Sequence, residues 1–100
     1  MRIFPDEQGK MNKSIIDANG EILLVSQFTL SGNIQKGNRP SFINSQDPEI
    51  AKKMIDDVAE IFSDRLTVKQ GIFGALMEVS LINDGPLTMF IESRDGKIQS

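Results

Sequence analysis

The six residues Asn83-Asp84-Gly85-Pro86-Leu87-Thr88 combine two strong turn signals with the means to bind a ligand. Asp-Gly and Gly-Pro both favour turns, and here they share one glycine. Glycine accepts a positive φ without steric cost, while proline fixes its own φ, lacks an N–H donor and can follow a cis peptide bond. Such a turn leaves main-chain carbonyls available to a ligand. The residues alone favour the simpler interpretation, a tight turn between two strands.

The residue types that are missing restrict the chemistry further. The sequence contains no cysteine and no histidine, which excludes disulfides, thiolate nucleophiles and His-dependent triads. The candidate hydroxyls of Ser26, Thr29, Ser41 and Thr88 have neither a nucleophile-elbow glycine pattern nor an obvious base beside them. Metal-ligand spacing and a phosphate-binding loop are also absent from the sequence. We therefore expect no metal and no cofactor.

Length, composition and charge indicate one soluble globular domain over residues 1–100. Apolar residues make up 39% of the chain and charged residues 25%. No segment has the length of a membrane span and the start is too polar for a signal peptide, so we expect a cytoplasmic protein without a membrane partner. The net charge of −3 argues against DNA and broad nucleic-acid capture, yet allows contact with one short single-stranded end. Positive charge at Lys36, Arg39 and Lys69 is interpreted first as solvated surface.

The first half of the chain predicts a hairpin that leads into a candidate site. Residues 13–17 are expected to pair with residues 21–30 through Asn19-Gly20, a two-residue turn signal. Residues 22–25 are apolar on both faces, which favours a strand inside the sheet. From Ser26 the strand becomes polar, and period two puts Ser26, Phe28 and Leu30 on one face. A buried strand that ends in polar residues is a common place for a site.

The remainder predicts one long helix followed by strands. Residues 31–46 are typical of a loop, after which Asp47 suits the N-cap, Pro48 the first turn and Glu49 the positive helix end. Residues 66–70, 75–82 and 87–92 are predicted strands, and Asp95-Gly96 a turn. The fold class is α+β, with a mostly antiparallel sheet of about five strands and one long helix packed on it. The stripe that faces the sheet comprises Ala51, Met54, Ile55, Val58 and Phe62.

Three motifs in order resemble the D-aminoacyl-tRNA deacylase family over nearly the whole chain. They are residues 26–30 (SQFTL), residues 36–42 (KGNRPSF) and residues 83–88 (NDGPLT). The resemblance implies a homodimeric hydrolase that cleaves the ester between a D-amino acid, or glycine mischarged on tRNA-Ala, and the 3′ end of the tRNA. It also implies that the Gly-Pro bond is cis. The turn of one subunit would enter the site of the other and refuse an L side chain by exclusion.

Carried onto this sequence, the resemblance gives expected roles to individual residues. Gly85 and Pro86 would form the chiral filter, with Asn83 and Thr88 beside them on the substrate. The catalytic pocket would consist of Ser26, Gln27, Phe28 and Thr29, where Phe28 seats the terminal adenosine and main-chain N–H groups face the ester. The family is thought to use the 2′-hydroxyl of the tRNA instead of a protein nucleophile. Lys36 and Arg39 are weaker candidates for tRNA contact.

The sequence departs from the family pattern at its start. Relatives of this kind carry several strands and most of a helix before the part that Met1-Arg2-Ile3-Phe4 resembles, so we expect an N-terminally shortened domain. Met1 would then be an internal methionine of a longer reading frame. Few strands and one helix also leave exposed sheet edges that call for a partner or further chain. The alternative to an enzyme is a non-catalytic remnant or interaction module of the same family.

Overall fold

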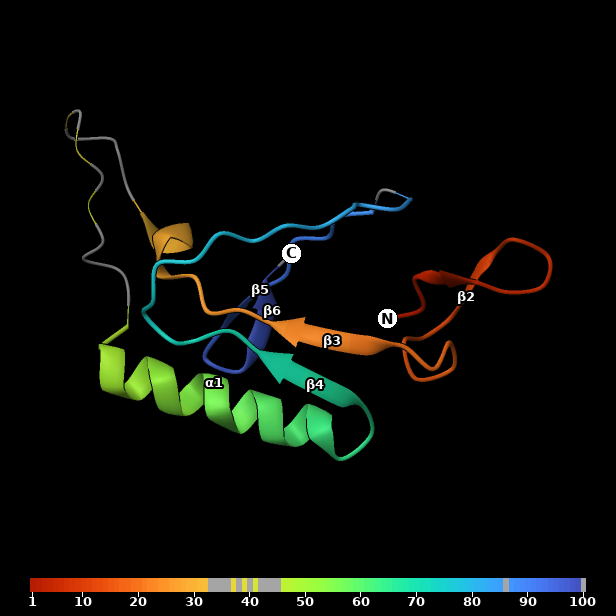
Figure 1. Ribbon diagram of the computed structural model, residues 1–100, viewed down its shortest axis with the longest axis horizontal. Helices are drawn as coiled ribbons and strands as arrows, with labels where there is room; N and C mark the ends of the chain where they lie inside the picture. Colours follow the sequence, from red (N-terminus) through yellow and green to blue (C-terminus); the bar gives the residue numbers. More distant parts are fainter. Residues whose placement is uncertain (33–36, 38, 40, 42–45, 86, 100) are drawn as a thin grey trace.

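The computed structural model describes residues 1–32, 37, 39, 41, 46–85 and 87–99. In these residues one long helix and one 3₁₀ turn accompany six short strands, which form three separate two-stranded sheets (Figure 1). The α+β class and the one long helix agree with the prediction from the sequence. The single sheet of about five strands does not form here. No helix in the described ranges is long and apolar enough to cross a membrane.

The N-terminal hairpin is organised by one carboxylate. Strand β1 (Phe4–Pro5) pairs antiparallel with β2 (Met11–Lys13). Between them the Asp6 carboxylate accepts hydrogen bonds from the Gln8 N–H, the Lys10 N–H and the Asn12 side-chain amide, each at 2.9 Å. The Asn12 contact, followed by the Lys10 contact, holds the pKa of Asp6 below its ordinary value of 3.8. The loop therefore depends on the ionised form of Asp6.

The predicted hairpin through Asn19-Gly20 is wrong. Residues 15–19 form turns in which the Ser14 N–H donates to Asp17 Oδ2 (3.0 Å) and the Asp17 N–H donates to Ser14 Oγ (3.1 Å). The Gly20 N–H donates to the Ile15 carbonyl at 2.9 Å, and Asn19 takes a φ of 55°. Reciprocal side-chain bonds of this kind compete with a strand ladder. They close the segment on itself, so the following strand takes another partner.

That partner comes from beyond the helix. Strand β3 (Glu21–Leu24) pairs parallel with β4 (Thr67–Gln70), from Glu21 opposite Thr67 to Leu24 opposite Gln70. Parallel neighbours require a crossover, and the chain between them contains helix α1 (Pro48–Ser63). The predicted position of this strand inside a larger sheet is wrong, because β3 and β4 form a two-stranded sheet. Its two faces also differ, since Ile22 and Leu24 are half-buried while Leu23 is 63% exposed.

Helix α1 begins as its sequence predicts. The Asp47 side chain accepts the Glu49 N–H at 3.0 Å, and Pro48 occupies the first turn. The helix lies along β4, as Figure 1 shows. The helix face predicted to contact the sheet is partly covered: its residues Ala51, Ile55 and Val58 are half-buried, and the neighbouring Ala59 is buried. Two stripe members remain more open, Met54 at 56% and Phe62 at 39% exposure.

The strands predicted at 75–82 and 87–92 are not formed, apart from residue 92. The described residues of 75–91 are exposed and run without a strand ladder. An extended segment becomes a strand only where its main chain pairs with a neighbouring edge, and none of the described strand pairings includes residues 75–91. The chain then ends in a hairpin, β5 (Glu92–Arg94) with β6 (Lys97–Gln99), through the predicted turn at Asp95-Gly96. Asp95 at φ 53° and Gly96 at φ 77° suit a type I′ turn.

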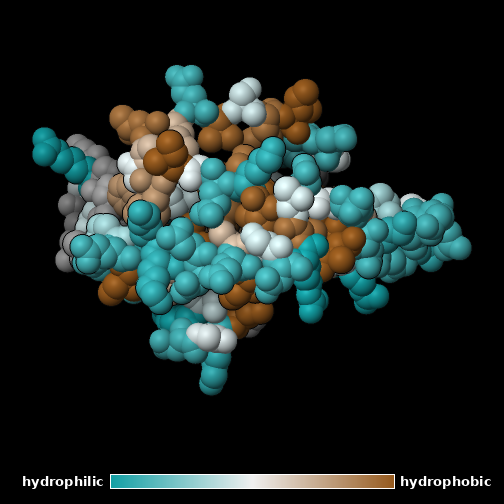
Figure 2. All heavy atoms as spheres, turned by 60° about the horizontal axis from the view of Figure 1, so that its bottom comes forward, coloured by the Kyte–Doolittle hydropathy of each residue, from teal (hydrophilic) through white to brown (hydrophobic). Residues whose placement is uncertain are grey.

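Little apolar surface is removed from water. Among the described residues the one buried hydrophobic side chain is that of Ala59, at 4% exposure. Leu76, Ile82 and Phe90 are exposed by 103%, 93% and 81%. Figure 2, which brings the helix side of the molecule forward, shows hydrophobic side chains at the surface among hydrophilic ones. A chain of this kind has much apolar area left for contact with other surfaces.

Candidate functional site

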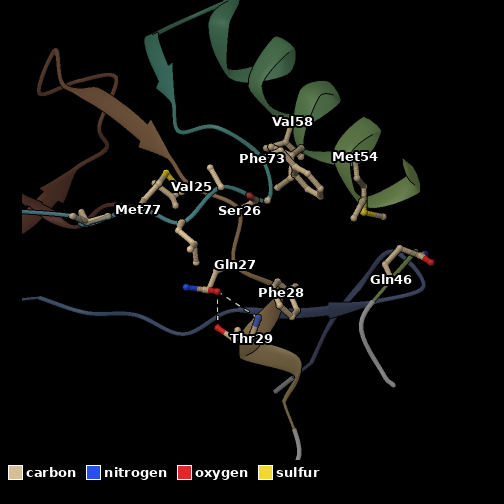
Figure 3. Close-up of a pocket in the computed structure, with 16 residues that line it drawn as sticks. Val25, Ser26, Gln27, Phe28, Thr29, Gln46, Met54, Val58, Phe73 and Met77 are labelled. Carbon is tan, nitrogen blue, oxygen red and sulfur yellow. Dashed lines mark hydrogen bonds between the residues drawn. The ribbon is translucent and has the colours of Figure 1, made fainter. Parts of the chain in front are cut away.

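A pocket of about 650 Å³ opens between the end of β3, helix α1 and the chain that follows β4 (Figure 3). Three parts of the sequence therefore build one cavity. Its walls are mainly apolar. The residues that line it are Val25, Ser26, Gln27, Phe28, Thr29, Gln46, Ala51, Met54, Ile55, Val58, Phe73, Gly74, Ala75, Leu76, Met77 and Val79.

All four residues predicted as catalytic line this pocket. The prediction that Ser26, Phe28 and Leu30 share one strand face is nevertheless wrong. Strand β3 ends at Leu24, and residues Phe28–Ser31 form the 3₁₀ turn η1. Coiling removes the period-two alternation, so neighbouring side chains reach the same cavity. The local reason is Gln27, which caps η1 with its own side chain.

The Gln27 side chain also fixes the Thr29 hydroxyl. Gln27 Oε1 accepts the Thr29 N–H at 3.4 Å and the Thr29 Oγ1 hydroxyl at 2.5 Å (dashed lines in Figure 3). The hydroxyl proton therefore points to an amide oxygen, which is not a base strong enough to remove it. Thr29 is arranged as an oriented polar group and not as an activated nucleophile.

Among the described residues that line the pocket, no side chain is ionisable. General acid–base catalysis by Asp, Glu or Lys thus has no group among the lining residues. The cavity offers apolar and aromatic walls together with the Ser26 and Thr29 hydroxyls and the Gln27 and Gln46 amides. Such a lining suits an uncharged aromatic or apolar group with a few polar atoms. In the described part of the chain, acidic side chains do not gather into a group that would hold a metal ion.

The second wall was missed by sequence reasoning. Residues 73–77 and Val79 were predicted as strand or left without a role, and Met54 as core; all of them line the pocket. The sequence signal that could have indicated this wall is the pair of glycines Gly71 and Gly74 at the start of the segment. A Cβ added at Gly71 would lie 3.0 Å from Met77 Sδ, so the absence of a side chain there lets Met77 approach the strand end.

The described members of the predicted substrate-binding set do not line the pocket. Asn83, Gly85 and Thr88 are exposed and absent from its lining. They belong to the segment that runs far from η1 in Figure 1 (cyan to light blue) before it returns to β5. Gly85 takes a φ of 138°, a conformation that favours glycine. Pro86 lies outside the described residues, and with it the Gly85–Pro86 bond.

Of the two residues predicted to contact tRNA, Lys36 and Arg39, the structure describes Arg39. Arg39 is exposed and does not line it. Lys69, on β4, is also exposed. Lys36 lies outside the described residues. Contact of Lys36 and Arg39 with tRNA stays a prediction.

Comparison with known proteins confirms the resemblance. The family model described as D-Tyr-tRNA(Tyr) deacylase matches residues 1–92. A "D-aminoacyl-tRNA deacylase" of Persephonella marina is 51% identical over 94 residues, and one of Thermosipho africanus is 52% identical over 95 residues. Each match covers 94% of this chain and 64% of the relative. These relatives are named as enzymes that remove an acyl group, hence as hydrolases.

A solved structure has the same arrangement. The protein named "c-Myc DNA Unwinding Element Binding Protein" superposes with a TM-score of 0.82 at 41% identity. The superposition covers 94% of this chain and 65% of that protein. The chain thus spans a little under two thirds of the length of the proteins that it matches.

Proposed function

This chain belongs to the D-Tyr-tRNA(Tyr) deacylase family, and from that premise we propose that it hydrolyses the ester joining a D-amino acid to the 3′ end of its tRNA. One observation carries the assignment to a site: Ser26, Gln27, Phe28 and Thr29 line the same pocket, whose other described residues are uncharged. The partner is the aminoacylated 3′ end, which presents an adenine ring, a ribose and an ester. The net charge of −3 suits a protein that contacts one tip of a nucleic acid instead of a duplex face.

The composition of the pocket points to a mechanism in which the substrate supplies a reacting group. Water adds to the ester carbonyl carbon, and the bond from that carbon to the ribose oxygen breaks. Because no described side chain of the lining is ionisable, the proton of the water passes through the neighbouring 2′-hydroxyl of the terminal ribose. The ribose oxygen leaves with a proton, which gives free D-amino acid and tRNA. Thr29, held by Gln27, orients the ester, and Phe28 stacks on the adenine.

Chiral selection is assigned to the Gly85-Pro86 turn. We propose that the turn is cis, enters the pocket of a second subunit in a homodimer and meets an L side chain with main chain, while Asn83 and Thr88 hold it in place. Support comes from the exposure of this segment and from the φ of 138° at Gly85. A turn that projects from its own subunit is free to reach another. Glycyl-tRNA, which has no side chain to exclude, is an additional substrate.

Two weaker assignments complete the proposal. Lys36 and Arg39 contact phosphates of the tRNA end, because they follow η1 in sequence and carry the charge that phosphate requires. Aminoacyl-tRNA is a cytoplasmic substrate, so the protein acts in the cytoplasm.

Deacylation of matched substrates tests the proposal. The protein is incubated with D-tyrosyl-tRNA and with L-tyrosyl-tRNA, and the remaining ester is followed with time. We expect loss of the D-ester well above its spontaneous rate, with the L-ester unchanged. Lys53→Gln, on the solvated helix face, is the matched control variant and should behave as wild type. A folded sample that leaves the D-ester intact would refute the proposal.

The exposed apolar surface favours a second candidate, a non-catalytic interaction module. Ala59 is the one buried hydrophobic residue among those described, so much apolar surface remains for association with a partner. Such a module would bind aminoacyl-tRNA or a protein without cleaving the ester. Binding of D-tyrosyl-tRNA in a filter assay without hydrolysis would favour this candidate over the enzyme.

A further inference from the structure

Two methionine side chains line the candidate pocket from different elements. Met54 belongs to helix α1 and Met77 to the chain that follows β4, and Figure 3 shows them at opposite sides of the cavity. Met54 is 56% exposed and Met77 is 41% exposed, so solvent reaches both residues. Met77 Sδ is also the atom that rests against Gly71. These two residues therefore combine access from water with a position on the wall of a binding site.

We propose that Met54 and Met77 make this pocket sensitive to peroxide, so that their reversible oxidation weakens its binding of uncharged apolar ligands. In the step, the thioether sulfur attacks the terminal oxygen of a hydroperoxide and the O–O bond breaks. Sulfur is oxidised by two electrons to the sulfoxide, and the hydroperoxide is reduced to an alcohol or to water. A thiol-dependent methionine sulfoxide reductase reverses the change. The chain contains no cysteine that would react in their place.

The sulfoxide matters here because of what surrounds it. It converts a flexible apolar side chain into a polar one. The described residues of the lining include no ionisable side chain to pair with the new S–O dipole, and their polar groups are concentrated at Ser26–Thr29 and Gln46. A ligand that covers the dipole removes it from water without a hydrogen bond. We expect this to weaken binding about tenfold.

The experiment uses Nile red, an uncharged apolar dye, as the probe. Its dissociation constant is measured by fluorescence before and after treatment with hydrogen peroxide, and sulfoxides are mapped by peptide mass spectrometry. The test variant is Met54→Leu/Met77→Leu. The matched control is Met11→Leu/Met89→Leu, whose methionines are 58% and 56% exposed and lie outside the pocket lining. The helical circular dichroism signal verifies that each treated sample is folded.

The expected result has three parts. Peroxide weakens dye binding by wild type and by the control variant about tenfold. It leaves the affinity of the Met54→Leu/Met77→Leu protein at its own untreated value. The reductase restores the affinity that wild type and the control variant lost. The proposal is overturned if Met54 and Met77 resist oxidation, or if mapped sulfoxides there leave the affinity of wild type within twofold. An equal loss of dye affinity in the Met54→Leu/Met77→Leu protein after peroxide treatment would also overturn the proposal.

The inference rests on the pocket and extends the proposed function. Deacylation of D-tyrosyl-tRNA by the same samples is expected to fall with dye binding. An untreated protein without deacylase activity would refute the proposed function alone, since the dye measurement does not depend on hydrolysis.

Discussion

At the scale of single residues, Gln27 and Thr29 show how a polar pair orients a site without a base. Gln27 Oε1 receives both the hydroxyl and the N–H of Thr29. The sequence was sufficient to single out both residues, because they stand in a recognisable motif. It was not sufficient to show their mutual bond, which requires the chain to coil after Leu24.

The Thr29 hydroxyl is expected to position the ester. Thr29→Val keeps the shape but removes the donor to Gln27 Oε1, whereas Thr29→Ser keeps the donor. A net hydrogen bond contributes about 0.5–1.5 kcal/mol, so kcat/KM for D-tyrosyl-tRNA should fall roughly threefold to tenfold in the valine variant. The serine variant should remain near wild type. Equal rates in the valine variant and wild type would argue against this role.

Gly85 is expected to matter through its backbone. Its φ of 138° is unfavourable for a residue with a side chain, at about 1–3 kcal/mol, while the nearest heavy atom to an added Cβ, the Leu87 nitrogen, is 3.5 Å away. Gly85→Ala should therefore shift the turn and reduce the ratio of D- to L-tyrosyl-tRNA hydrolysis. Thr88→Ala should reduce it less. If Gly85→Ala leaves this ratio intact, the turn is not the chiral filter.

The Asp6 loop is expected to loosen in acid. Its side-chain bond from Asn12 and main-chain bonds from Lys10 and Gln8 favour the ionised carboxylate and lower its pKa. A depressed folded pKa means that this contribution is complete above the ordinary value and lost as pH falls through the folded value. NMR should find the Asp6 titration below 3.8, with the Gln8 and Lys10 amide shifts moving at the same midpoint. In Asp6→Asn those amide shifts should not titrate there.

At the scale of elements, local signals were reliable where neighbouring residues satisfy one another. Helix α1 starts at the predicted cap, and the Asp95-Gly96 turn joins β5 and β6. The predicted hairpin over residues 13–30 does not form, and the reason is again local hydrogen bonding. Ser14 and Asp17 bond reciprocally and close their own turn, which the Asn19-Gly20 signal did not anticipate.

The helix cap offers a test of element stability. Asp47→Ala removes the acceptor of the Glu49 N–H, and loss of such a cap costs about 0.5–2 kcal/mol. Chemical denaturation followed by circular dichroism at 222 nm should show a lower midpoint. Asp47→Ser, which keeps a capping oxygen, should recover most of the loss. A midpoint unchanged in the alanine variant would mean that packing on β4 alone sets the start of the helix.

At the scale of the whole molecule, the pocket and the Gly85 turn are separate. The pocket residues gather beside α1, whereas Asn83, Gly85 and Thr88 are exposed and outside it. With Leu76, Ile82 and Phe90 exposed as well, the segment that carries the turn has apolar surface available to another subunit. A homodimer in which each turn completes the other site would use both features.

Mixing a pocket variant of low activity with a turn variant of low selectivity tests that arrangement. One carries Thr29→Val with Phe28→Ala in the pocket, and the other carries Gly85→Ala in the turn. If the turn acts across subunits, the mixed dimer contains one site with an intact pocket and an intact turn. Selective hydrolysis of D-tyrosyl-tRNA should then reappear on mixing. Activity equal to the sum of the separate variants would show that the turn does not act across subunits.

The sequence by itself determined the helix and the terminal turn, because each depends on residues that are neighbours in the chain. It also indicated the family and, through the family's motifs, the four residues Ser26–Thr29, because a motif can be recognised without knowing how the chain folds. Only the tertiary structure decided the parallel pairing of β3 with β4 and the wall formed by Met54, Phe73 and Met77. These depend on which distant segments meet. The sequence of a segment shows which of its residues are apolar. It does not show which sheet edge or cavity the segment will contact, because that depends on long-range packing.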